Sequence, residues 1–171
     1  GSENDSESVK KYVNEHLLAH KSMGEDAAHR MSSYGTSDLE KMAQRFNAAH
    51  ESAISFLIPE DKISRARASL LFIESYRELP LLAWPRKLID AVVELEESMV
   101  KWRHSHARMV ERIMGRRIGT GGTSGVDYLD KTSQYRVFKD LWAVRTILVK
   151  SDKRPELINP DFYGFYSEKE A

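Results

Sequence analysis

Hydrophobic residues recur along most of this chain at alternating spacings of three and four, which places them on one face of an α-helix. The longest such pattern runs from Pro85 to Gly115, with no Pro or Gly between them. Pro85 suits a first helical turn and Gly115 suits a helix end. A helix of this length measures roughly 45 Å. Its predicted apolar face consists of Leu88, Val92, Leu95, Met99, Trp102, His106, Met109 and Ile113.

Three shorter helical patterns come earlier in the chain. The second opens with a capping box, Ser37-x-x-Glu40, and stops at Pro59. The third follows Asp61, which suits an N-cap, and ends before Pro80. Between the first two, we expect residues 24–35 to form a loop. The predicted apolar faces are Val9, Tyr12, Val13, Leu17 and Leu18 in the first pattern, and Leu39, Met42, Ala43, Phe46, His50, Ala53, Ile54 and Leu57 in the second.

A last helical pattern begins at Ser133. No segment shows the strict alternation typical of a β-strand. The predicted fold is therefore an all-α helical bundle, built around one long helix that is followed by a glycine-rich loop. The apolar face of the last helix is predicted to hold Tyr135, Phe138, Leu141, Trp142, Arg145 and Leu148.

His106 stands where the apolar face of the long helix would ordinarily take Leu or Met. A buried imidazole needs a partner for each ring nitrogen. Two explanations remain open: a core histidine bonded to a backbone carbonyl, or a ligand of a metal or haem iron. His104 is two residues away and points elsewhere, so the two histidines do not form a same-face pair.

Two further histidines, His16 and His20, lie four residues apart on the first predicted helix. This spacing can bind a metal ion. Because no acidic residue or further histidine is evident nearby as an additional ligand, we expect both side chains to lie on a solvated helix face.

The segment Gly119–Gly125 follows the long helix and contains four glycines, with only Thr and Ser between them. Such a segment can adopt positive φ and let its backbone approach a ligand closely. Its N–H groups can also form an anion-binding concavity. It lacks the lysine of a P-loop and the glycine spacing of a dinucleotide fingerprint. Taken alone, it is compatible with a ligand-binding loop or with a flexible linker.

The long helix and this loop together resemble the tryptophan 2,3-dioxygenase family. The matching motifs are K-W-R-x-x-H at Lys101–His106, M-V-E-R-I-x-G at Met109–Gly115 and G-T-G-G-T-S-G at Gly119–Gly125. The resemblance continues through Tyr135–Phe138 and Leu141–Thr146 and weakens upstream, through Ile89–Glu96. It covers roughly the C-terminal half of the chain. The combination is specific, because it also places Thr120 fourteen positions after His106.

The resemblance implies a helical haem pocket in which His106 is the proximal ligand of haem b and therefore the metal ligand. Trp102 lies four residues earlier on the same helix face. In the family, the loop threonine, here Thr120, contacts the amino group of the substrate. Gly121, Gly122 and Ser124 are then expected to shape the substrate-binding wall.

The same resemblance suggests a distal side for the haem. Family members place an aromatic residue and a histidine there, and Phe46 and His50 have the matching spacing. Phe46 would contact the substrate and His50 would be a catalytic residue that orients oxygen or the indole N–H. A core or interface histidine is the alternative for His50. The family's long N-terminal region and its carboxylate-binding arginine are not found as such. Arg45, Arg65 and Arg67 are candidates for that arginine, with a solvated surface charge as the alternative for each.

The amino-acid composition excludes several classes of protein and of binding site. The chain has 171 residues, 26 basic and 26 acidic side chains, a net charge of +0 and no cysteine. A balanced charge gives no general attraction to nucleic acid or anionic membranes. The absence of cysteine excludes disulfides and thiolate ligands. No apolar run approaches the ~20 residues of a membrane span, so we expect a cytoplasmic protein. We expect residues 1–8 to be a disordered leader and residues 9–171 to form a single haem-binding domain.

The resemblance implies an enzyme that uses haem and O₂ to oxygenate L-tryptophan or a related indole across the indole C2–C3 bond, giving N-formylkynurenine. The alternative is a haem-binding sensor or accessory subunit without turnover of its own. A haem-free helical interaction module, with His106 merely buried, is a third class. A homo-oligomer or a companion chain is expected to complete the distal pocket.

Overall fold

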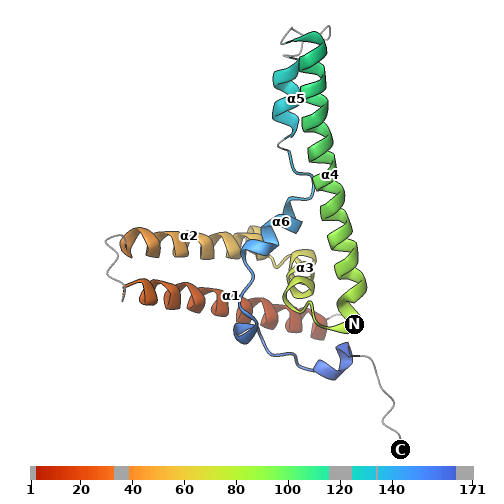
Figure 1. Ribbon diagram of the computed structural model, residues 1–171. Coiled ribbons are helices and arrows are strands. Elements are labelled where there is room, and N and C mark those ends of the chain that lie inside the picture. Colours follow the sequence, from red (N-terminus) through yellow and green to blue (C-terminus); the bar gives the residue numbers. More distant parts are fainter. Residues whose placement is uncertain (1–2, 33–38, 116–124, 134, 165–171) are drawn as a thin grey trace, which may run out of the picture. The chain divides into compact units, whose positions relative to one another are not determined.

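The computed structural model describes residues 3–32, 39–115, 125–133 and 135–164. These residues form α-helices and short 3₁₀-helices, with no β-strand among them, which confirms the all-α class (Figure 1). No helix in these ranges is both long and apolar enough to cross a membrane. The elements are α1 (Glu3–Ser32), α2 (Leu39–Leu57), η1 (Pro59–Asp61), α3 (Arg65–Ser75), η2 (Pro80–Leu82), α4 (Ala83–Met114), α5 (Val126–Ser133), α6 (Lys139–Thr146), η3 (Ser151–Lys153) and η4 (Pro160–Tyr163).

The chain divides into two compact units. The first unit comprises Gly1–Arg86 and Trp142–Ala171, and the second comprises Lys87–Leu141. Helix α1 already begins at Glu3, inside the segment that we expected to be disordered.

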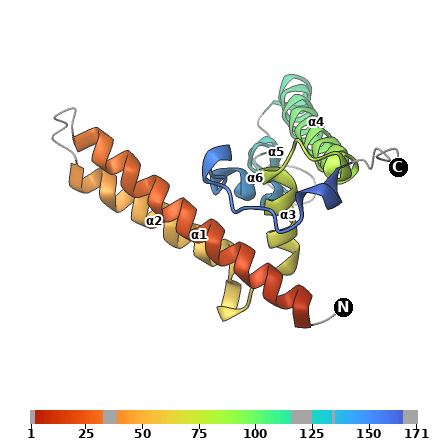
Figure 2. The same cartoon turned by 90° about the horizontal axis from the view of Figure 1, so that it is seen from below.

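In the first unit, α1 and α2 run antiparallel, side by side (Figures 1 and 2). From the predicted apolar faces of these helices, Val13, Leu17, Ala53 and Leu57 are buried in the core with α3, whereas Leu18 and Ile54 are exposed. Burial of such side chains contributes about 1.5–3 kcal/mol each and holds the helices together. The buried core consists of Val13, Leu17, Ala53, Leu57, Ala68, Leu71, Val144 and Ile147.

Helix α1 continues through Gly24, so the predicted loop over residues 24–35 is wrong for residues 24–32. A Cβ atom at Gly24 would lie 3.4 Å from the Cβ of Phe46 on α2. The glycine therefore serves a close approach of the two helices rather than a turn. The predicted capping-box residue Ser37 lies outside the described residues.

Local hydrogen bonds and backbone conformation determine where α3 begins and where α4 ends. Ser64, not Asp61, caps α3, because its side chain accepts a hydrogen bond from the Arg67 backbone N–H at 3.4 Å. Gly115 ends α4 as predicted: its φ is +66°, and its N–H donates to the Glu111 carbonyl at 2.9 Å. A left-handed residue at this place is cheap only for glycine.

In the second unit, α5 lies beside α4 (Figure 1) and is bound to it through α4 arginines. The Arg108 guanidinium binds both carboxylate oxygens of Asp130 on α5. Arg103 donates to the carbonyl oxygens of Thr132 at 3.4 Å and Tyr135 at 3.2 Å. These carbonyls stand at the C-terminal end of α5, where a positive charge is favourable.

The helix predicted to begin at Ser133 is wrong, because α5 ends there and α6 begins only at Lys139. The carboxylate of Glu96 on α4 accepts hydrogen bonds from the backbone N–H groups of Val137 and Phe138, the latter at 2.9 Å. Glu96 is 2% exposed. This tertiary contact holds the backbone out of a helix even though the side-chain pattern is compatible with one.

Candidate functional site

Helix α4 positions His106 on the predicted apolar face, which is mostly exposed. The predicted apolar stripe is largely exposed: Trp102 is 65% exposed and Ile113 is 75% exposed. The buried positions Val93, Glu96 and Ala107 lie on a neighbouring face of the helix. This apolar face is therefore not packed into a core formed by the described residues. The remaining exposed members are Leu88, Leu95, Met99 and Met109.

The His106 imidazole is half-buried and lies against Trp102, as the spacing of four residues predicted. The two ring centroids are 5.3 Å apart and the ring planes differ by 5°. Among the described residues, no hydrogen bond is formed by either ring nitrogen of His106. The arrangement therefore does not show the carbonyl-bonded core histidine that was one of the two explanations. His104 is exposed on another part of the helix.

The residues around His106 fit a haem group. A neutral imidazole nitrogen is a common proximal ligand of haem iron. Exposed Trp102, Met99 and Met109 offer apolar and polarisable surface on the same helix face, which suits a flat porphyrin. Within the described ranges, no group of three His, Cys, Asp or Glu side chains is placed to hold a bare metal ion. If haem is bound here, His106 would hold its iron, and Trp102, Met99 and Met109 would line the porphyrin.

The expected substrate wall, Thr120, Gly121, Gly122 and Ser124, lies outside the described residues. At its C-terminal end, Gly125 has a φ of +57°, and its carbonyl accepts from Leu129 N–H at 3.2 Å as α5 begins.

The two predicted distal residues lie on α2 in the first unit. Phe46 covers Gly24 of α1. The His50 ring stacks on that of His20, with centroids 5.7 Å apart and planes 21° apart. Among the substitutes for a carboxylate-binding arginine, Arg67 donates to the Phe56 carbonyl at 3.1 Å and lies over its ring, while Arg45 and Arg65 are exposed.

The histidine pair on α1 is buried, so the predicted solvated face is wrong. His16 is 0% exposed, and its Nε2 donates to the Ile147 carbonyl at 2.8 Å. His20 is 8% exposed. Burial lowers the pKa of His16, although its bond to Ile147 opposes this, and the nearby His20 lowers it further. Burial also lowers the pKa of His20, with His50 as the second cause.

These shifts predict that the folded chain loses stability as the pH falls. The unfolded chain takes up protons on these histidines near pH 6.5, while the folded chain takes them up only at lower pH. The contribution of these neutral histidines to the free energy of unfolding is therefore complete above about pH 7.5. Below about pH 6.5 it falls by up to ~1.4 kcal/mol per pH unit for each histidine. Urea unfolding at pH 7.5 and 5.5 measures it. His16→Gln keeps a donor for Ile147 and should flatten the dependence; an equal slope in both proteins would contradict the assignment.

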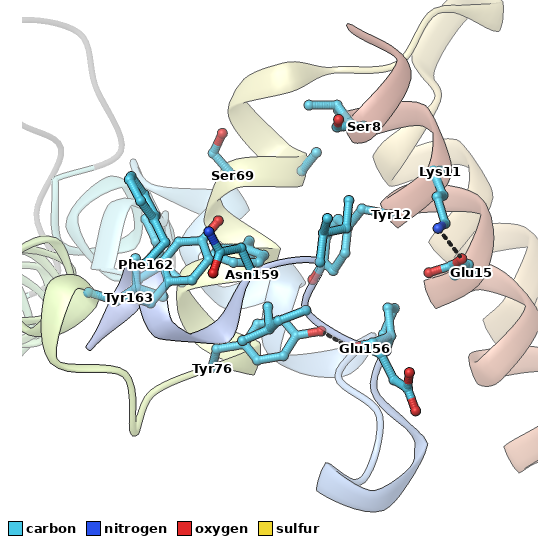
Figure 3. A pocket seen from close by; sticks show the side chains of 18 residues that line it. Ser8, Lys11, Tyr12, Glu15, Ser69, Tyr76, Glu156, Asn159, Phe162 and Tyr163 are labelled. Atoms are coloured by element: carbon cyan, nitrogen blue, oxygen red, sulfur yellow. Dashed lines mark hydrogen bonds and ion pairs between the residues drawn. The ribbon is translucent and has the colours of Figure 1, made fainter. Parts of the chain in front are cut away.

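A cavity of ≈ 500 Å³ also lies in the first unit, between α1, α3 and the segment Pro155–Tyr163 (Figure 3). The Tyr76 hydroxyl donates to the Pro155 carbonyl, and Arg154 pairs with Glu78 at 2.7 Å, which fixes this wall. Burial raises the pKa of Tyr76 to about 12, so it stays neutral. The cavity contains none of the predicted site residues, and the candidate site therefore remains on α4.

Three residues that hold the second unit together were not predicted from the sequence: Glu96, Arg103 and Arg108. A signal for two of them existed. Val93, Glu96, Val100, Arg103 and Ala107 repeat at spacings of three and four, which makes a second face on the long helix.

The sequence matches the family model described as tryptophan 2,3-dioxygenase over residues 4–148. It is 48% identical over 147 residues to a tryptophan 2,3-dioxygenase-like protein of Xanthomonas campestris pv. campestris (strain 8004), covering 80% of this chain and 54% of that protein. The tryptophan 2,3-dioxygenase of Sorangium cellulosum is 49% identical over 142 residues, 77% of this chain and 34% of that protein. Tryptophan 2,3-dioxygenase B of Danio rerio is 38% identical over 136 residues, 75% of this chain and 33% of that protein.

The extent of these matches corrects one expectation. The similarity covers most of the chain, from residue 4 to residue 148, and not only its C-terminal half. It therefore includes helices of both units. The chain spans about half the length of the Xanthomonas relative and about a third of the other two.

Proposed function

We infer that this chain, which belongs to the tryptophan 2,3-dioxygenase family, takes part in haem-dependent oxygenation of L-tryptophan or a related indole. The reaction adds both atoms of O₂ across the indole C2–C3 bond and gives N-formylkynurenine when the substrate is tryptophan. Bound haem b would supply the oxygen chemistry, which no side chain of this protein can perform.

The observation that carries this proposal is the state of His106. Its imidazole has no hydrogen bond to a described residue and lies on an exposed apolar helix face next to Trp102. A core histidine of the carbonyl-bonded kind would be buried with its ring nitrogens bonded within the protein, whereas His106 is half-buried. We assign His106 as the axial ligand, and Trp102, Met99 and Met109 as the apolar surface that excludes water from the cofactor.

The substrate contacts remain proposals from family similarity. Thr120 would bind the substrate amino group, and Gly121, Gly122 and Ser124 would let the backbone come close to it. Phe46 and His50 are proposed for the distal side. The stacking of His50 on His20 gives that imidazole a structural role as well.

A further chain is proposed to complete the pocket. The stripe of α4 that holds His106 leaves several large side chains uncovered. Contiguous apolar surface of this kind marks interaction sites. A second copy of this chain or a companion protein would cover the surface and supply distal residues.

Turnover provides the test of this function. When the protein is supplied with haem, reductant, O₂ and tryptophan, we expect it to form N-formylkynurenine. The ultraviolet absorption of this product measures its formation. Thr120→Ala should lower kcat/KM about tenfold or more with an unchanged haem spectrum, because one hydrogen bond to a charged group contributes ~1.5–3 kcal/mol. Thr123→Ala is the matched control within the same loop.

Two outcomes would argue against oxygenation. Haem binding without any product, in the presence of all substrates, would favour the sensor or accessory subunit. Equal effects of Thr120→Ala and Thr123→Ala would remove the assigned role of Thr120.

A further inference from the structure

One guanidinium in the second unit joins two helices close to His106. Arg108 stands two residues after His106 on α4. Its Nη2 atom binds both oxygens of Asp130 on α5, and its Nη1 atom binds the Glu111 carboxylate at 2.5 Å. The side chains of Arg108 and Asp130 are 39% and 34% exposed. This pair is thus partly shielded from water, and partly buried, charge-assisted contacts are stronger than exposed ion pairs.

The position of Asp130 gives this contact its consequence. Asp130 follows Gly125 by five residues, and residues 126–130 belong to α5. Near the C-terminal end of the same helix, Arg103 donates to the carbonyl oxygen of Thr132, and also to that of Tyr135 just beyond the helix. Helix α5 is therefore attached to α4 at two places, and the arginines that attach it flank His106 in sequence.

Alternative roles for Arg108 are weaker. A solvated charge would not bring its guanidinium onto two carboxylates on different helices. An interaction confined to α4 would need only Glu111, at the i, i+3 spacing typical of a helix. The contact with Asp130 connects residues 22 positions apart and spans the glycine-rich segment.

We propose that Arg108 and Asp130 are positioning residues that fix α5, and with it the Gly125 end of the glycine-rich segment, against the helix that carries His106. The expected substrate-binding residues directly precede Gly125 in the sequence, so loss of the pair is expected to impair substrate binding. This inference rests on the proposed function for its catalytic consequence, but the docking of α5 stands independently of it.

Hydrogen exchange measures the docking directly. In the 171-residue chain, Arg108→Met should speed exchange of the amides in residues 126–133 about tenfold, with amides of α3 unchanged. The magnitude corresponds to one charge-assisted contact. Arg112→Met removes an exposed arginine one turn further along α4 and should leave α5 exchange as in the wild type.

Exchanging the charges of Arg108 and Asp130 gives a stricter test of the positioning role. Arg108→Met and Asp130→Asn should each lower kcat/KM for tryptophan about tenfold, with an unchanged haem spectrum. The double variant Arg108→Asp with Asp130→Arg should recover most of both the slow exchange and the kcat/KM. A loss of stability without mispositioning would instead change the haem spectrum or the exchange of α3.

The results separate this inference from the proposed function. Unchanged α5 exchange in Arg108→Met, or a double variant no better than the single variants, would overturn the positioning role. If no protein in the series oxygenates tryptophan, the proposed function fails, while the exchange data still decide whether the pair docks α5.

Discussion

Replacing His106 with glycine is expected to abolish stable haem binding and the oxygenation that depends on it. The variant removes the only histidine on the exposed apolar stripe of α4 and leaves Trp102 and the methionines in place. Loss of an axial ligand should cost more than the ~10–100-fold loss seen when an outer-shell partner of a metal ligand is removed. The Soret absorption of protein passed through a desalting column measures retention of haem.

Two controls make the result specific. His104→Gly changes a neighbouring exposed histidine and should retain the haem spectrum of the wild type. Free imidazole should restore a Soret band to His106→Gly, because it can occupy the space left by the side chain. A wild-type spectrum in His106→Gly without imidazole would refute the assignment of the axial ligand.

Replacing Glu96 with alanine should destabilise the second unit by about 2–4 kcal/mol, since it leaves two backbone donors without their acceptor. These donors are the N–H groups of Val137 and Phe138, and Glu96 itself is 2% exposed. The ion pair of Glu96 with Arg136, at 3.9 Å, is lost as well. Urea unfolding followed by helical circular dichroism measures the change.

The adjacent glutamate provides the comparison. Glu97 is exposed on the same helix, and Glu97→Ala should change stability by less than about 0.5 kcal/mol. Glu96→Gln keeps one acceptor oxygen and should lie between the two. If Glu96→Ala and Glu97→Ala unfold alike, the buried carboxylate does not organise the segment between α5 and α6.

The sequence predicted α4 well because its signals are local. Pro85 and Gly115 mark its two ends, and the positive φ of Gly115 confirms why the helix stops there. Trp102 and His106 were expected to be neighbours because residues four apart meet on a helix, and their rings do stack.

The covered face of α4 could not be predicted in the same way. Periodicity tells which residues share a face, but not which face another element covers. The stripe through Trp102 is the more apolar one, yet the face through Val93 and Glu96 is buried. A glutamate in a helix ordinarily predicts a solvent-exposed position. The backbone N–H groups that bind the Glu96 carboxylate lie about 40 residues further along the chain, so the sequence near Glu96 gives no sign of them.

Long-range contacts explain the other differences. His16 is buried because its ring reaches the carbonyl of Ile147, 131 residues away. Gly24 remains helical because Phe46 of α2 packs over it. Tyr135 and Phe138 fit a helical period, but Glu96 binds the backbone between α5 and α6 instead. The roles of the loop residues, including Thr120, were predicted from the family resemblance, because no hydrophobic or helical pattern in the sequence indicates them.

The central claim is that His106, whose imidazole is bound by no described residue, holds the haem iron from an apolar helix face. The most direct measurement is a titration of the purified 171-residue chain with haem, followed by its absorption spectrum. We expect a sharp Soret band that saturates near one haem per chain, is retained on gel filtration and is absent from His106→Ala. A wild-type protein that stays colourless after the titration, or a band that is identical in His106→Ala, would contradict the account.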